Sequence, residues 1–199
     1  MNSIEKLTNL FKRFPGIGPR QAKRFVYFLL SQHSSFIDEL IKEIQVLRTQ
    51  TTQCTECFIY FTKDNFSELC DTCNRSSTDT STLLVVSKDV DVEAIKRADV
   101  YKGRYFVLGG TLPFLEKVPT NYVRSTQLAA YIARHRADLR EIIFALPVTP
   151  EGDNTRKFLI DTLPLEHISY KTLGRGLSTG TEIEYSDSDT IASAFRNRY

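Results

Sequence analysis

The sequence contains no apolar run approaching the ~20 residues that a membrane-spanning helix requires. Its N-terminus, residues 1–6, leads into an amphipathic segment and not into an apolar one, so no secretory signal peptide is expected. The net charge of +2 is small for 199 residues. Cysteine is scarce, and its four residues all lie in two short pairs. These absences exclude a membrane-spanning helix and a disulfide-rich secreted chain, and they favour a cytoplasmic protein.

The two cysteine pairs are Cys54-x2-Cys57 and Cys70-x2-Cys73, with twelve residues between them. Each pair can place two thiolates on one turn, and two such pairs complete a tetrahedral site for Zn²⁺. Such a site leaves no coordination position for a substrate, so it stabilises a small module and performs no chemistry. Two disulfides or four unrelated thiols are the alternatives, and two pairs with no cysteine left over favour zinc. The stretch between the pairs, residues 58–66, predicts a short strand and a turn.

The positive charge is concentrated at the N-terminus. Residues 1–31 carry six Lys and Arg against Glu5 alone, a net of +5, which leaves −3 for the rest of a chain whose net charge is +2. Any contact with a polyanion is therefore expected in this N-terminal segment.

Apolar residues recur at helical spacing in residues 4–14, 21–30 and 36–48, which predicts three helices in a small N-terminal domain. A turn with the sequence Phe-Pro-Gly-Ile-Gly-Pro, residues 14–19, separates the first two. Its first proline ends a helix, its glycines permit backbone angles closed to other residues, and its last proline suits the first turn of the next helix.

Three cations, Arg20, Lys23 and Arg24, fall near the start of the second helix. Gly16 and Gly18 leave backbone amides bare for close approach, and the positive end of the helix dipole points the same way. The sequence therefore predicts a cradle for a nucleic-acid phosphate, bound without regard to base identity. The pattern resembles the helix–hairpin–helix motif of DNA-repair proteins, which implies contact with DNA. A plain helical hairpin with a solvated basic face is the alternative.

Beyond a polar segment expected to be a linker, residues 74–82, short apolar runs alternate with helical patterns. The expected strands are residues 83–86, 105–108, 142–145 and 167–170, and the expected helices are residues 92–98, 123–136 and 154–162. This alternation predicts a mostly parallel sheet flanked by helices.

The C-terminal segment predicts a flexible loop over residues 174–180 and an alternating strand over residues 181–185. Ser188 is positioned to cap a last helix that runs from Asp189 to about Arg198. The apolar stripe of this helix is Ile191, Ala192 and Phe195. That stripe would pack on its own domain or on a neighbouring subunit.

The order of these features resembles the bacterial recombination mediator family RecR. The matching segments are residues 14–19, the four cysteines, Asp91-Val92 with Ala94-Ile95, residues 103–110, Glu151-Gly152, residues 174–177 and residues 182–185. The resemblance implies a multi-module α/β fold. Its parts are a helix–hairpin–helix DNA-binding domain (1–52), a four-cysteine zinc finger (53–75), a Toprim domain (80–176) and a C-terminal strand–helix tail (177–199).

The same resemblance implies a function in DNA repair and recombination. The expected activity is that of a non-catalytic clamp, a tetrameric ring that binds the DNA phosphate backbone without sequence specificity. With RecO-type and RecF-type proteins it would promote recombinase loading at gaps, in a pathway independent of an end-resection nuclease. Glu151 and Asp153 are candidate partner-binding residues, and ordinary solvated acids are the alternative for them.

Catalytic Toprim domains hold Mg²⁺ with a Glu after the first strand and an Asp-x-Asp after a later one. The corresponding places here are Ser87 and the segment Pro147-Val148-Thr149, and none of these side chains is a carboxylate. Members of the family usually have Glu at the position of Ser87. A Mg²⁺-dependent Toprim nuclease or primase-like enzyme is therefore the weaker alternative. A zinc-ribbon protein that binds RNA or another protein, with no role in repair, is a third hypothesis.

Overall fold

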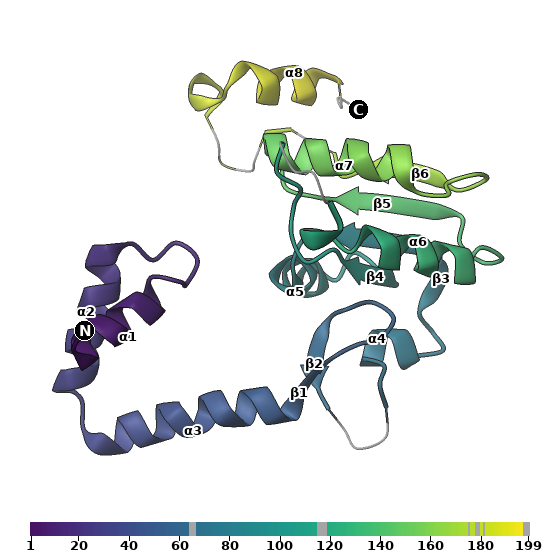
Figure 1. Ribbon diagram of the computed structural model, residues 1–199. Coiled ribbons are helices and arrows are strands. Elements are labelled where there is room, and N and C mark those ends of the chain that lie inside the picture. The colour runs from purple at the N-terminus through teal and green to yellow at the C-terminus, as the bar shows by residue number, and fades with distance from the viewer. Residues whose placement is uncertain (64–66, 115–118, 175, 178–179, 181, 197–199) are drawn as a thin grey trace. The chain divides into compact units, whose positions relative to one another are not determined.

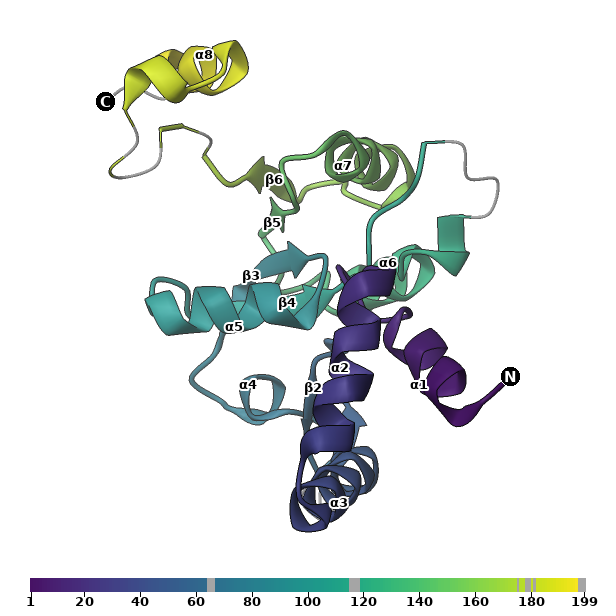
Figure 2. The same cartoon turned by 90° about the vertical axis from the view of Figure 1, so that its left-hand side faces the viewer.

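The computed structural model describes residues 1–63, 67–114, 119–174, 176–177, 180 and 182–196. The chain divides into two compact units, Met1–Thr52 and Gln53–Tyr199. Figures 1 and 2 show the helices and strands from two directions. No helix in the part of the chain that the structure describes is both long enough and apolar enough to cross a membrane.

Three helices form the N-terminal unit, as the apolar spacing predicted: α1 (Ser3–Phe11), α2 (Pro19–Ser31) and α3 (Ser34–Gln50). A capping box starts α1. The Asn2 side chain accepts the Glu5 amide at 2.9 Å, and the Glu5 carboxylate accepts the Asn2 amide at 3.1 Å. These two bonds satisfy orphan amides of the first turn and fix where α1 begins.

Aromatic contacts join α1 to α2. The ring of Phe11 lies 5.7 Å from the ring of Phe14 and 5.6 Å from that of Phe25, measured between centroids. Ala22 and Val26 are the buried residues of α2, and α1 and α3 have none. The unit therefore has a small core and leaves much of its apolar surface exposed.

The four-cysteine segment contains a two-stranded sheet, β1 (Thr51–Gln53) with β2 (Tyr60–Thr62), and a short helix, α4 (Asp71–Asn74). The predicted strand after the first cysteine pair is thus present. Most of the turn predicted to follow it lies at residues 64–66, outside the described residues.

The four strands of the central sheet are β3 (Asp79–Val86), β4 (Gly103–Val107), β5 (Glu141–Ala145) and β6 (Ser169–Thr172). They lie in the order β4-β3-β5-β6, and every neighbouring pair is parallel. The predicted parallel sheet is confirmed.

All four strands begin one to four residues away from their predicted starts. β3 starts at Asp79, inside the expected linker, because Asp79 pairs with Gly103 and Thr82 with Glu141. Backbone pairing at the outer end of a sheet needs no apolar side chains, so the polar sequence concealed it. The fourth strand begins at Ser169, after His167, whose φ of +70° interrupts an extended chain.

Three helices flank this sheet: α5 (Asp89–Ala98), α6 (Ser125–Arg134) and α7 (Pro150–Thr162). A 3₁₀ turn, η1 (Pro119–Asn121), precedes α6. Alternate residues of β3 face opposite cores. Leu83 and Val85 pack with residues of α6 and α7, whereas Leu84 and Val86 pack with Val92 of α5 and three of the cysteines. Figure 2 shows α5 on one side of the sheet and α6 and α7 on the other.

The C-terminal segment differs from its prediction in two ways. A 3₁₀ turn, η2 (Ile183–Tyr185), stands where an alternating strand was predicted, and residue 181 lies outside the described residues. The strand prediction is wrong because the central sheet ends at β6, so these residues have no strand to pair with in the described part of the chain. The last helix, α8 (Ser188–Arg196), is capped by Asp187 and not by Ser188, since the Asp187 carboxylate accepts the Thr190 amide at 2.9 Å.

Candidate metal centre and nucleic-acid surface

The two cysteine pairs meet in space. The sulfur atoms of Cys54, Cys57, Cys70 and Cys73 all lie within 4.8 Å of one another, and those of Cys57 and Cys70 are 3.5 Å apart. The first three cysteines are buried, and Cys73 is half-buried. In the described part of the chain, no other group of three or more His, Cys, Asp and Glu side chains is close enough to hold a metal ion.

Each pair is folded by its own backbone. We call the turn that holds each cysteine pair a knuckle. In the first knuckle, the Phe58 amide donates a hydrogen bond to the Cys54 carbonyl at 3.0 Å, and Phe58 has a left-handed φ of +62°. In the second, the Cys73 amide donates to the Cys70 carbonyl at 3.0 Å. A turn of this size brings the side chains at its first and fourth positions to the same side. The two knuckles then face each other across the site.

The donor set fits a tetrahedral metal ion. Four sulfurs at the usual zinc–sulfur distance of about 2.3 Å from one ion would be roughly 3.8 Å apart, within the spacing found here. The Cys70 amide approaches the Cys54 sulfur at 3.4 Å. The cluster could therefore hold one metal ion, with all four positions filled by protein.

The first knuckle is joined to the central sheet. The Val107 amide, at the end of β4, donates to the Cys57 carbonyl at 2.9 Å. The ring of Phe58 packs edge-on against that of Phe106, with centroids 5.3 Å apart. Arg124 lies over the same Phe58 ring, its guanidinium carbon 5.0 Å from the centroid. The metal cluster and the sheet therefore share one core.

A polar contact that sequence reasoning missed reinforces this junction. Glu56, inside the first cysteine pair, accepts Arg134 at 3.3 Å and lies 3.0 Å from the Nε2 atom of His135, at the end of α6. Arg134 and His135 lie 78 and 79 positions after Glu56 in the chain, so no local sequence pattern indicates these contacts.

The predicted phosphate cradle lies at the start of α2. Gly18 is the N-cap residue of this helix and Pro19 its first residue, while Gly16 has a left-handed φ of +74°. A Cβ atom added at Gly16 or Gly18 would have no atom within 4 Å, so the backbone is open to an approaching ligand.

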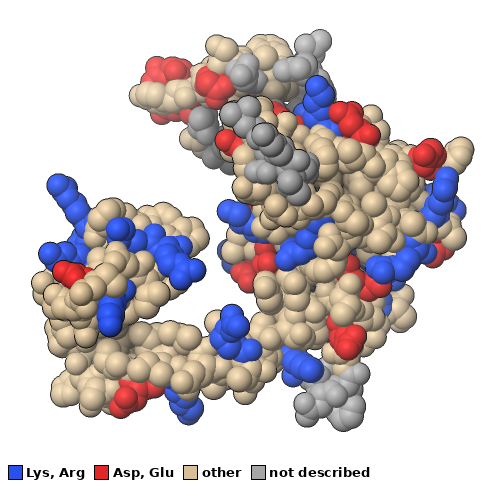
Figure 3. Space-filling model, viewed as in Figure 1, with Lys and Arg blue, Asp and Glu red and all other residues tan. Residues whose placement is uncertain are grey.

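The three predicted cations of this cradle, Arg20, Lys23 and Arg24, are exposed. None of them forms an ion pair with a described residue. Figure 3 shows that most charged side chains on the visible surface of α1 and α2 are Lys and Arg. Close proximity of exposed amides and unpaired cations suits a phosphate, although contact with DNA stays a prediction.

The edge of the sheet where catalytic Toprim domains hold metal has a different chemistry here. Ser87 follows β3, is 1% exposed, and donates its hydroxyl to an Asp91 carboxylate oxygen at 2.7 Å. The same oxygen accepts the Lys88 amide at 2.9 Å. Asp91 is therefore engaged in fixing the start of α5.

The segment after β5 supplies structure instead of ligands. The Thr149 side chain accepts the Gly152 amide at 3.1 Å and caps α7, and Val148 is 69% exposed. A Cβ atom at Gly152 would lie 2.0 Å from the Pro147 carbonyl oxygen, so only glycine fits there. The backbone of this turn is therefore closely packed at Gly152.

The two candidate partner-binding acids lie in the first turn of α7. Glu151 is exposed, whereas Asp153 is half-buried and pairs with Arg156 at 3.2 Å. Glu151 is thus the more accessible of the two. Arg175, in the matching loop after β6, lies outside the described residues.

Comparisons with known proteins cover nearly the whole chain. Residues 4–47 match the family model "RecR, helix-hairpin-helix", residues 81–173 match "Toprim domain", and residues 176–199 match "RecR, C-terminal". A recombination protein RecR of Cereibacter sphaeroides (strain ATCC 17025 / ATH 2.4.3) is 33% identical over 195 residues, which are 98% of this chain and 95% of that protein. The chain belongs to the RecR family.

Other RecR proteins give the same result. One from Maricaulis maris (strain MCS10) is 33% identical over 98% of this chain and 94% of its own length. One from Jannaschia sp. (strain CCS1) is 32% identical over 98% of this chain and 95% of its own length. The four-cysteine cluster lies between the first two matched segments of this RecR-family chain, after residue 47 and before residue 81. The family inferred from the ordered motifs is thereby confirmed.

Proposed function

We propose that this RecR-family chain is a non-catalytic DNA-binding clamp of recombination and repair. The observation that carries the proposal is the cradle at the start of α2. There, Arg20, Lys23 and Arg24 are exposed and unpaired among the described residues, next to the open backbone of Gly16 and Gly18. Cations and amides of this kind contact phosphates, which are the same in every sequence, so binding would be independent of base identity.

Zn²⁺ is the metal that we propose for the four cysteines. Four thiolates in tetrahedral spacing favour zinc among the common ions of the cell, while calcium and magnesium require oxygen ligands. A bound ion of this kind supplies folding free energy and no reactive position. Its role would be to hold the two knuckles together and, through Cys57, to anchor them to β4.

The proposal that the chain is not catalytic is based on the residues at the edge of the sheet. Ser87 and Pro147–Thr149 supply no carboxylate, and Asp91 is engaged by Ser87 and by the Lys88 amide. Phosphoryl chemistry by the Toprim route needs carboxylates to hold Mg²⁺ at this edge. The nuclease or primase-like alternative therefore lacks the carboxylates that it requires at these positions.

The clamp would act as an assembly. Five large apolar residues of α3 are exposed by 37% to 62%: Phe36, Leu40, Ile41, Ile44 and Leu47. A stripe of this size on one helix suits burial against another subunit. The tetrameric ring, the RecO-type and RecF-type partners, and their docking at Glu151 and Asp153 follow from family membership and belong to the proposal. Recombinase loading at DNA gaps is the corresponding cellular role.

Charge reversal at the cradle tests the DNA-binding proposal. The variant Arg20→Glu/Arg24→Glu should lose binding to duplex and single-stranded DNA in a low-salt titration, with unchanged zinc content and circular dichroism. The matched control is Arg97→Glu/Lys157→Glu, which changes the net charge equally at two exposed residues of the other unit. Unchanged affinity of the first variant would remove the cradle from the proposal.

Two further measurements test the RNA-binding alternative and the oligomeric state. Competition between duplex DNA, single-stranded DNA and structured RNA separates a repair factor from a zinc-ribbon protein that prefers RNA. Solution mass with and without DNA, combined with a zinc assay, checks the assembly. Four subunits and one zinc per chain are expected, and a monomer under both conditions would contradict the ring.

A further inference from the structure

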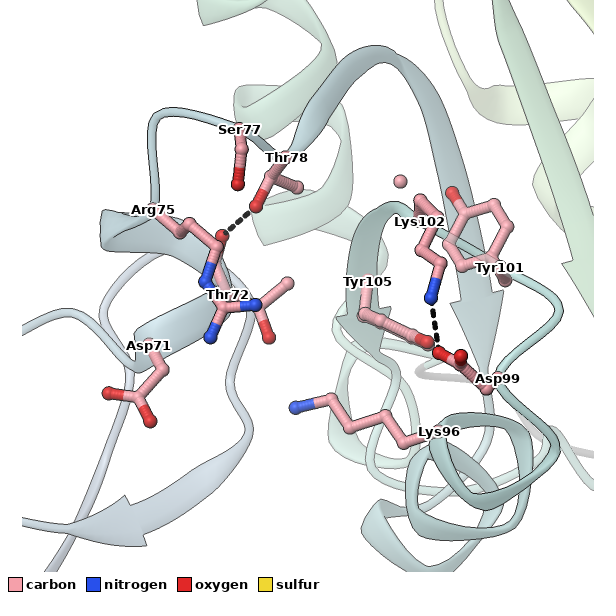
Figure 4. Close-up of a pocket in the computed structure, with 11 residues that line it drawn as sticks. Asp71, Thr72, Arg75, Ser77, Thr78, Lys96, Asp99, Tyr101, Lys102 and Tyr105 are labelled. Carbon is pink, nitrogen blue, oxygen red and sulfur yellow. Dashed lines mark hydrogen bonds and ion pairs between the residues drawn. The ribbon is translucent and has the colours of Figure 1, made fainter.

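A cavity of about 300 Å³ lies between the four-cysteine segment and the central sheet (Figure 4). Its walls come from α4 and the turn that follows it, from the end of α5, and from the start of β4. These parts all belong to the second unit, remote in sequence from the cradle of α2. Neither sequence reasoning nor the comparisons assign a role to this cavity.

Three cations line the cavity, one from each wall. Arg75 follows α4, Lys96 lies in the last turn of α5, and Lys102 stands just before β4. Figure 4 shows Lys96 extending from α5 toward α4, with its ammonium end in the space between the two walls. Arg75 and Lys96 form no ion pair with a described residue. Two unpaired cations that line the same cavity favour an anion there.

The carboxylates present do not neutralise these cations. Asp99 pairs with Lys102, but the side chains are 78% and 69% exposed, and exposed pairs of this kind contribute little. Asp71 is the other acid in the lining. Three cations and two carboxylates leave the cavity with a net charge of +1.

The floor of the cavity is rigidly built. A Cβ atom at Gly103 would lie 2.1 Å from the Thr82 hydroxyl and 2.4 Å from the Tyr101 hydroxyl, so only glycine allows this packing. The Tyr101 ring packs edge-on against Tyr105 at 5.2 Å, and its hydroxyl donates to the Arg104 carbonyl at 2.9 Å. This part of the lining is therefore closely packed.

The same floor positions one of the cations. The Lys96 ammonium lies 5.6 Å from the centroid of the Tyr105 ring, a cation–π contact that limits where it can point. A cation held in place loses less conformational entropy when an anion arrives. Ser77 adds a hydroxyl to the same lining.

We propose that this cavity is a binding site for a phosphoryl group. The planar guanidinium of Arg75 can bind two phosphate oxygens at once, while the ammonium groups of Lys96 and Lys102 act as point charges. The volume accommodates a phosphate with part of its attached sugar. The ligand is either a backbone phosphate of a DNA strand or a free mononucleotide. The first source rests on the proposed DNA-binding function, whereas the chemistry of the site does not.

The test uses the full, metal-loaded chain and three probes: inorganic phosphate, ADP and a short oligothymidylate. Binding at the cavity is followed by the backbone NMR shifts of Ser77 and Gly103, at constant ionic strength. The test variant is Arg75→Gln/Lys96→Gln, and the control is Arg97→Gln/Lys157→Gln. The control removes the same charge at exposed positions outside the cavity. Lys96→Gln alone is a milder version should the double variant fold poorly.

Phosphate should shift both amides, and the test variant should bind phosphate at least about tenfold more weakly, because it removes two charge-assisted hydrogen bonds. The control should bind as the unaltered chain does. Competition by the oligonucleotide identifies strand phosphates as the source, and competition by ADP alone identifies a free nucleotide. No shift at either amide, or equal loss in the control, overturns the proposal.

Failure of this inference is distinguishable from failure of the proposed function. Arg20→Glu/Arg24→Glu should lose strand binding yet keep the phosphate-induced shifts at Ser77 and Gly103. Shifts that vanish with this remote variant would mean that the cavity is not an independent site, which also overturns the proposal.

Discussion

The Val107 amide donates to the carbonyl of Cys57 across 2.9 Å, joining a strand of the central sheet to a residue of the metal cluster. β4 is an edge strand, and β3 is its neighbour on the other side. The knuckle therefore covers the free edge of the sheet near this point. Because an uncovered edge would expose unpaired backbone groups, the cluster stabilises the sheet as well as itself.

Removal of the metal should therefore loosen the end of β4. With a chelator, or with Cys70→Ser, we expect faster hydrogen exchange at the Val107 amide than at Phe144 in β5. The free energy of unfolding should fall by more than about 3 kcal/mol, because structural zinc sites contribute on the order of 10 kcal/mol. Hydrogen exchange by NMR and urea denaturation measure the two effects. Unchanged protection of Val107 in metal-free protein would show that the knuckle does not depend on the metal.

The two glycines of the α2 cradle should respond differently to alanine. Gly16→Ala forces a side chain into a left-handed conformation, at a cost of roughly 1–2 kcal/mol in the free energy of unfolding. Gly18 has an ordinary φ of −79° and open space around it, so Gly18→Ala should change stability by no more than about 0.5 kcal/mol. Urea denaturation checks this pair of values.

The same Gly18→Ala variant tests whether a phosphate contacts the backbone amides of this turn. Its methyl group would stand where a phosphate approaches the amides, so DNA affinity should drop several-fold in a fluorescence anisotropy titration. If this variant bound DNA as the unaltered chain does, the amides of the turn would play no part, and the cations alone would account for binding.

Restoring one Toprim carboxylate should not create a nuclease. In Ser87→Glu the new side chain would stand near Asp91, but the Pro147–Thr149 segment would still supply no acid. We expect no plasmid nicking with Mg²⁺ or Mn²⁺, either in this variant or in the unaltered chain. Nicking by the unaltered chain that depends on a divalent ion, and that a change in the sheet edge abolishes, would contradict the non-catalytic proposal.

Stability should decline in alkaline solution through Tyr131. Burial raises the pKa of this residue to about 12, from 10 in the unfolded chain. Below pH 10 the hydroxyl is protonated in both states, so the stabilisation is complete there. Between pH 10 and 12 only the unfolded chain releases the proton, and the free energy of unfolding falls by about 1.4 kcal/mol per pH unit.

Tyr131→Phe should remove this part of the alkaline slope. Urea denaturation at several pH values between 9 and 12 measures it, with Tyr170→Phe, an exposed position, as the control. An unchanged slope in Tyr131→Phe would assign the alkaline sensitivity to other groups, such as Tyr101, whose pKa burial also raises.

Much of the fold could be predicted from local patterns. Helical spacing and the Pro-Gly-Ile-Gly-Pro turn located α1 and α2, and the alternation of apolar runs with helices located a parallel sheet. The spacing of the four cysteines predicted that their sulfur atoms would meet. These features were accessible because each depends on residues close together in the chain.

The strand predictions were wrong where strand formation depends on a neighbouring strand. Asp79–Thr82 is polar yet belongs to β3, because β4 and β5 lie beside it. Residues 183–185 form a 3₁₀ turn, although polar and apolar residues alternate here as in a strand. In the described part of the chain, no neighbouring strand is available to pair with them. Alternation is compatible with a strand, but a neighbouring strand must supply the hydrogen bonds.

By itself, the sequence determined the kinds of modules, the four-cysteine cluster and the position of the basic cradle, since these depend on residue type and short spacing. Only the tertiary structure decided that Cys57 bonds to Val107, that Glu56 contacts His135, and that Arg75, Lys96 and Lys102 line one cavity. Each of these joins elements remote along the chain. Long-range proximity follows from packing of whole elements, and no local pattern records it.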